Sequence, residues 1–91
     1  MATAYLFELR DMTPGQAAAV LEELGLGGKP APGQVLHIEG PMDGGGTRVV
    51  DVWESQEALD TFIQRLVPIV QREGIAPPQP SAVWPVAAIL K

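Results

Sequence analysis

The order of the periodic segments limits the fold of this 91-residue chain more than any other feature. Four stretches have the alternating or β-rich pattern of strands: residues 3–10, 34–39, 47–53 and 81–90. Two others carry apolar residues at helical spacing, one between Thr13 and Gly25 and one between Ser55 and Gly74. The expected order is therefore strand, helix, strand, strand, helix, strand.

Local signals mark where the helices begin and where they are interrupted. Thr13 is a helix-capping residue, Pro14 suits the first helical position, and Gln16 can reach back to the capping residue. Ser55 is the corresponding cap of the second helix. Pro68 has no N–H for the preceding turn, so we expect a kink or a break just before it.

This order is that of a ferredoxin-like α+β fold, with a four-stranded antiparallel sheet and two helices on one face. Strands 34–39 and 47–53 are expected to pair, because a glycine-rich turn joins them at hairpin spacing. Pro85 predicts a bulge or an edge position for the last strand. Strands 3–10 and 81–90 are apolar on both sides, which does not suit a sheet with one face in water. We therefore expect a second copy of the chain to cover the open face.

Composition limits the class of molecule and its partners. The chain is expected to form a single domain, residues 1–91, with 46% apolar residues to supply a core. A domain of this size buries a limited share of its surface, which favours a homodimer over a monomer. The net charge of -5 and the lack of any Arg or Lys cluster argue against nucleic acid and membrane surfaces as partners.

The sequence lacks the usual signs of export or membrane insertion. It has no cysteine, so it forms no disulfide, thiol nucleophile or thiolate metal site. The first ten residues lack the basic region of a signal peptide, and no apolar run approaches the ~20 residues that span a bilayer. A cytoplasmic location is the expectation.

Four segments carry a resemblance to known proteins: Gln-Val-Leu-His at 34–37, Gly40-Pro41 with the glycines that follow, Arg48 to Ala58, and Pro85-Val86. Together they resemble small bacterial proteins of the dimeric α+β barrel superfamily, of the antibiotic-biosynthesis-monooxygenase type. The resemblance spans nearly the whole chain. It implies that two copies join their sheets face to face into a barrel with the helices outside. It leaves the reaction open, because the superfamily includes monooxygenases, polyketide cyclases, lactone isomerases and haem enzymes.

Two positions depart from the common pattern of those proteins. Thr47 stands where a tryptophan often follows the hairpin glycines, and Ala87-Ala88 stand where a polar His-Asn pair often follows Pro-Val. A reactive site that uses the polar pair in the relatives would lack these two polar side chains here.

His37 is the leading candidate for acid-base chemistry, because it is the only histidine and its ordinary pKa lies near neutrality. Strand alternation puts Glu39 on the same side of the sheet, where its carboxylate could orient the ring. Asp51 is the candidate partner of His37 across the hairpin. The alternatives are a structural histidine, and an Asp51 that pairs with Arg48, Arg10 or a backbone N–H.

Aromatic residues are the candidates for the walls of a pocket. Tyr5 adds a hydroxyl that could polarise a carbonyl or a phenol, so it joins His37 and Asp51 as a candidate catalytic residue. Trp53, Phe62 and Trp84 are candidate substrate-binding residues. The alternative for all of them is a place in the core.

No cofactor or metal is expected. One histidine, no cysteine and scattered acidic residues lack the clustered ligands of a zinc or iron centre, and a haem would have His37 as its sole nitrogen ligand. The glycines at 44–46 are expected to form a flexible hairpin loop, because no Lys-Ser/Thr pair follows them as in a phosphate-binding loop.

Two functions remain open from the sequence. The first is a cofactor-independent enzyme of the monooxygenase, isomerase or cyclase type, which acts on an apolar or aromatic metabolite with His37 as its acid-base group. The second is a non-catalytic homodimeric module of the same fold, in which His37 is structural.

Overall fold

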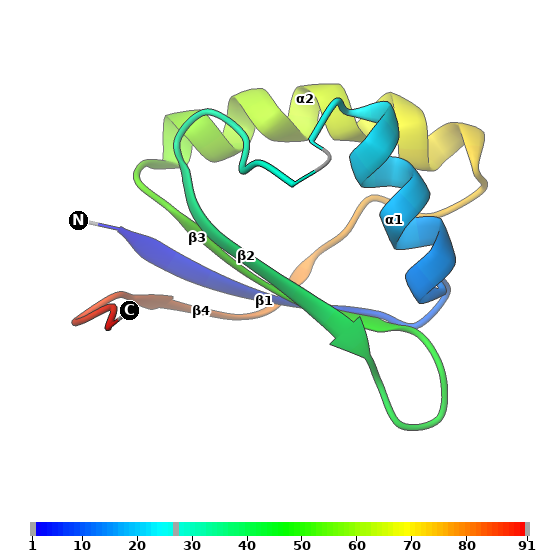
Figure 1. Ribbon diagram of the computed structural model, residues 1–91, viewed down its shortest axis with the longest axis horizontal. Coiled ribbons are helices and arrows are strands. Elements are labelled where there is room, and N and C mark those ends of the chain that lie inside the picture. The colour runs from blue at the N-terminus through cyan, green and yellow to red at the C-terminus, as the bar shows by residue number, and fades with distance from the viewer. Residues whose placement is uncertain (1, 27, 91) are drawn as a thin grey trace.

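The computed structural model describes residues 2–26 and 28–90 of the chain. Its elements follow the predicted order: β1 (Thr3–Leu9), α1 (Pro14–Glu23), β2 (Gln34–Pro41), β3 (Thr47–Trp53), α2 (Gln56–Arg72) and β4 (Pro80–Pro85). The strands form an antiparallel sheet in the order β2-β3-β1-β4, and both helices cover the same face of it (Figure 1). The prediction of a ferredoxin-like α+β fold is confirmed.

The two helices begin at the predicted caps. The Thr13 side chain accepts a hydrogen bond from the backbone N–H of Gln16, and the Gln16 side chain accepts one from the backbone N–H of Thr13. Ser55 caps α2 through the backbone N–H of Ala58. These bonds satisfy N–H groups that the first turn of a helix leaves free.

Of the two outcomes expected at Pro68, the break is wrong, because α2 runs as one helix from Gln56 to Arg72, and the kink stays a prediction. A proline removes one hydrogen bond from the helix, and tertiary packing offsets that loss. Val70, just after the proline, is fully buried, and Leu66 and Ile69 pack against the same cluster. The turns on both sides of Pro68 are therefore held against α1.

Strand β4 is shorter than the predicted strand at 81–90, and it lies at the edge of the sheet. Its last residue, Pro85, pairs with Thr3, which is the first residue of β1. Beyond this pair, a backbone hydrogen bond from the N–H of Val86 to the carbonyl of Ala2 still joins the two segments. The edge position predicted from Pro85 is confirmed, since a proline is tolerated where no further strand needs its N–H.

The hairpin between β2 and β3 fixes the register on which the site depends. Strand β2 extends two residues beyond the predicted end, to Pro41, which pairs with Thr47. Gly46 closes the turn with φ +94°, and a Cβ there would lie 2.7 Å from the backbone oxygen of Leu9. The buried Thr47 hydroxyl donates to the Met12 carbonyl at 2.8 Å, which ties the start of β3 to the segment before α1.

The core lies between the sheet and the helices. One cluster joins β1 and β3 to α2 and contains Tyr5, Phe7, Val49, Trp53 and Leu59. A second cluster lies between the helices and contains Met12, Val20, Leu24 and Val70. Within residues 2–26 and 28–90, no helix is long and apolar enough to span a membrane.

Candidate functional site

The side chains of His37 and Asp51 meet on the helix-covered face of the sheet. The two residues are register partners on β2 and β3, so their side chains point to the same face from adjacent strands. The distance between His37 Nδ1 and Asp51 Oδ1 is 2.5 Å. The predicted contact between these two residues across the hairpin is confirmed.

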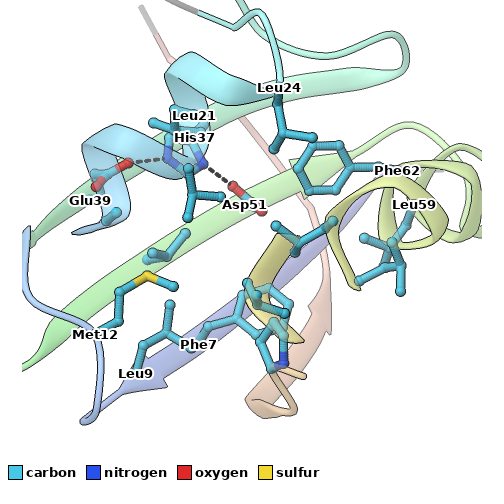
Figure 2. A pocket seen from close by; sticks show the side chains of 17 residues that line it. Phe7, Leu9, Met12, Leu21, Leu24, His37, Glu39, Asp51, Leu59 and Phe62 are labelled. Atoms are coloured by element: carbon cyan, nitrogen blue, oxygen red, sulfur yellow. Dashed lines mark hydrogen bonds and ion pairs between the residues drawn. The ribbon is translucent and has the colours of Figure 1, made fainter. Parts of the chain in front are cut away.

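Glu39 occupies the other side of the imidazole ring. It lies two residues along β2, on the same face, and its Oε1 is 2.7 Å from His37 Nε2 (Figure 2). The side chains of His37 and Glu39 are both 22% exposed, whereas that of Asp51 is 8% exposed. The ring therefore lies between an inner and an outer carboxylate.

Gln34 completes the network, although strand alternation in the sequence does not predict its place there. Its Nε2 donates to Asp51 Oδ1 at 3.1 Å, and its Oε1 accepts from the backbone N–H of Ala31 at 3.0 Å. Strict alternation would place Gln34 on the face opposite His37, but β2 has a register shift between Gln34 and Leu36. This irregularity is what brings a buried amide to Asp51.

The two carboxylates favour the charged form of the ring. The hydrogen bond to Asp51 raises the pKa of His37 from 6.5 to about 9, against the opposing effect of burial, and the bond to Glu39 adds to the increase. At neutral pH both ring nitrogens then carry protons and donate to carboxylates. His37 is accordingly a proton donor rather than a base in this state.

The three charged side chains form part of the wall of an otherwise apolar cavity between the sheet and the helices (Figure 2). The cavity has a volume of about 70 Å³ and opens to solvent. Phe62 from α2 and Phe7 from β1 line it, together with leucines from α1. An ionic group thus borders a small apolar space, an arrangement typical of sites that orient an apolar ligand through a few polar contacts.

The other predicted site residues do not line this cavity. Tyr5 is the register partner of Asp51 on β1, but its hydroxyl donates to Gln56 Oε1 at 3.0 Å, at the start of α2. Trp53 is fully buried behind Phe62, with 5.1 Å between the ring centroids. Trp84 pairs with Ala4 and lies on the opposite face of the sheet, where it is 43% exposed.

The geometry of the site does not suit a metal ion. The two carboxylates approach the ring from opposite nitrogens, so they do not converge on one point. Among the residues that the structure describes, no group of three or more His, Asp or Glu side chains is placed to hold a metal.

The comparison with solved structures gives a match to a protein from Deinococcus radiodurans, described as a "putative antibiotic biosynthesis monooxygenase". The match covers 100% of this chain and 97% of the other, with a TM-score of 0.60 and 10% sequence identity. No protein-family model matches the chain, and no curated protein matches it either. At this identity the match shows a shared fold, in agreement with the resemblance drawn from the sequence.

Proposed function

We propose that the protein is a cofactor-independent enzyme that acts on a small apolar or aromatic metabolite with His37 as its acid-base group. One observation carries this proposal: an imidazole held between two carboxylates borders an apolar cavity. The structural match to a protein described as a monooxygenase is in keeping with it.

The site suits a paired proton transfer. Asp51 fixes the ring from the buried side, and the protonated Nε2 is aimed outward at Glu39. When a substrate oxygen replaces Glu39 on Nε2, His37 donates a hydrogen bond or its proton to that oxygen. The displaced Glu39 carboxylate then accepts a proton from the neighbouring carbon or hydroxyl of the substrate, and the reverse transfers restore both groups.

This proton movement is shared by the candidate reaction types. An isomerase or a cyclase needs only the proton transfers. A monooxygenase of this kind needs in addition a substrate whose deprotonated form reacts with dioxygen. In each case Phe62 serves as the apolar wall, Trp53 supports Phe62 from behind, and Tyr5 anchors β1 to α2 through Gln56.

The same proposal includes a homodimer. Two rows of apolar residues cross the open face of the sheet from edge to edge: Ile38, Val50, Leu6 and Ala82 in one row, and Leu36, Val52, Ala4 and Trp84 in the other. Ile38 is 56% exposed in the single chain. Trp84 is 43% exposed, whereas Ala4 and Val52 are already buried, so a second copy that covers these rows would remove mainly their outer apolar residues from water.

A non-catalytic module remains the second candidate, and a specific observation favours it. Both ring nitrogens of His37 already have partners, so the network needs no ligand to be satisfied. In this case the network serves to fix β2 against β3, and the cavity is filled by a bound apolar molecule or by shifts of its own side chains.

The experiment that separates the two candidates compares His37→Gln with the wild-type protein on a panel of flat phenols and lactones. We expect the variant to keep a cooperative thermal transition and to lose turnover, and we expect the ring signals of His37 in the wild-type protein to shift when a ligand of the panel is added. Asp51→Asn serves as a matched control that leaves the ring in place and alters its charged partner. A panel on which the wild type shows no turnover, with a His37→Gln variant that merely melts earlier, would favour the structural module.

A further inference from the structure

A second hollow lies against the same charged residues, on the outer side of β2. It is a groove between the edge strand β2 and the segment that connects α1 to β2. Its volume is about 490 Å³, against about 70 Å³ for the inner cavity. Ligand sites in proteins are usually about 300–1,000 Å³, so the groove has room for the body of a metabolite, and the inner cavity has room for a small apolar group of it.

The groove and the cavity share a wall. Leu21, His37 and Glu39 line both of them. The partial exposure of His37 and Glu39 is consistent with access to the ring from the groove. A molecule in the groove would therefore meet Nε2 of His37 as soon as the Glu39 carboxylate moved aside, without any opening of the core.

The lining of the groove is mainly apolar and also includes the amide of Gln34 and one cation besides His37. Leu26, Pro30 and Val35 supply apolar surface, and Lys29 contributes its ammonium group. In the described part of the chain, Lys29 forms no ion pair, whereas Arg48 and Arg72 contact Glu8 and Glu23. The groove thus offers two cations, Lys29 and the protonated ring of His37. The ring is already paired with the carboxylate of Glu39.

We propose that this outer groove binds an apolar molecule that carries one anionic oxygen, a carboxylate or a phenolate, and that this oxygen replaces Glu39 on His37 Nε2 while Lys29 contacts the same charge. The proposal rests on the proposed function, since it names the substrate class of that site. Glu39 acts in it as the internal carboxylate that holds the ring until the ligand arrives. The anionic oxygen of the ligand takes over the hydrogen bond that Nε2 loses when Glu39 moves aside, so the charged ring keeps a partner on both nitrogens.

The test uses three probes that share a ring and differ in their oxygen: benzoate, 4-nitrophenolate and the neutral benzamide. Binding is followed by the NMR signals of the His37 ring, which report contact at Nε2. We expect benzoate or 4-nitrophenolate to shift these signals at concentrations where benzamide does not. The two anions distinguish a carboxylate site from a phenolate site.

Variants test the role of each charge. Lys29→Met should weaken binding of the anionic probe about two- to fivefold, the range for an exposed ion pair, without changing the response to benzamide. Arg10→Gln is the matched control, because it removes an exposed cation outside the groove and should have no effect. Glu39→Gln should tighten binding of the anion about threefold or more, because the competing carboxylate is lost while an acceptor for Nε2 remains.

Equal effects of Lys29→Met and Arg10→Gln, or equal binding of benzamide and benzoate, would overturn the assignment of the groove. If turnover of another substrate still required His37, the proposed function would stand and only its substrate class would be wrong. If benzoate bound as expected and no substrate of the class were turned over, the groove would stand as a binding site and the catalytic proposal would fail.

Discussion

The two tryptophans lie on opposite faces of one sheet and show how differently the faces are used. Trp53 is 0% exposed beneath the helices, whereas Trp84 is 43% exposed on the open face. The covered face also holds the charged network of Gln34, His37 and Asp51, and the open face carries the two apolar rows. Chemistry is therefore proposed for the covered face, and association with a second copy for the open one.

The contrast follows from what each surface needs. A charged group under the helices is stable only when its partners surround it, and His37, Asp51 and Gln34 satisfy one another. On the open face the apolar side chains of Ile38 and Trp84 are exposed in the single chain, although Ala4 and Val52 between the edges are buried. Substitutions on either face test this contrast.

The largest effect is expected from Trp53→Ala on the covered face. Loss of a fully buried indole leaves a cavity against Phe62, and such changes cost about 3–5 kcal/mol. Urea unfolding measures the difference. Trp53→Phe is the control: it keeps a ring, leaves a smaller cavity and removes an indole N–H that has no hydrogen-bond partner among the described residues, so it should cost clearly less than Trp53→Ala. Equal losses from the two variants would contradict this packing.

The next effect is expected from Asp51→Ala. The change leaves the ring of His37 and the amide of Gln34 without their shared acceptor, which should cost about 1–3 kcal/mol in the free energy of unfolding. It should also lower the pKa of His37 strongly, because the hydrogen bond to Asp51 is the main cause of the increase. Chemical denaturation and NMR titration of the same variant check both results. A pKa unchanged in the variant would mean that Asp51 does not hold the ring.

The network should also make stability depend on pH. The folded protein binds the His37 proton more tightly than the unfolded chain does, because the pKa rises from 6.5 to about 9 on folding. The contribution of His37 to the free energy of unfolding is therefore complete below pH 6.5 and is lost as the pH rises through about 9. We expect the free energy of unfolding to decrease by about 1–3 kcal/mol over this range. Urea unfolding between pH 6 and 10 measures this, and His37→Gln should flatten the curve over that range. An increase in stability over the same range would contradict the account.

The smallest effect on stability is expected from Trp84→Ser on the open face. An exposed side chain contributes little to a single chain, so the change should be within about 0.5 kcal/mol at concentrations where the protein is monomeric. At micromolar concentrations the same variant should shift the protein from dimer to monomer in sedimentation velocity. Val83→Ser is the control, because Val83 is also exposed but pairs with Tyr5 and belongs to the other face. A wild-type protein that is already monomeric would rule out the proposed dimer.

Much of the fold and the centre of the site could be predicted from local patterns. The capping box at Thr13 and the strand at 47–53 match the structure, because side-chain hydrogen bonds and strand alternation act over a few residues. Hairpin spacing combined with alternation was also enough to bring His37 and Asp51 together. These features depend on neighbours in sequence or on one short turn.

The remaining parts depend on longer-range contacts. A one-residue shift in β2 turned Gln34 inward, and no alternation pattern reveals such a shift. Trp84 could not be placed, because the last strand is apolar on both faces and its pattern does not say which face the helices cover. The outer groove depends on how the connector around Lys29 lies against β2, which its glycines and prolines leave undetermined.

If two carboxylates hold His37 as a charged acid at the edge of the cavity, the pKa of its ring must show it. The single histidine gives unambiguous ring signals in an NMR titration. We predict a titration midpoint of His37 near 9 in the wild-type protein. We predict a lower midpoint in Glu39→Gln, because a neutral amide then replaces one of the two carboxylates. A wild-type midpoint at or below 6.5, unchanged in Glu39→Gln, would contradict this role of the two carboxylates.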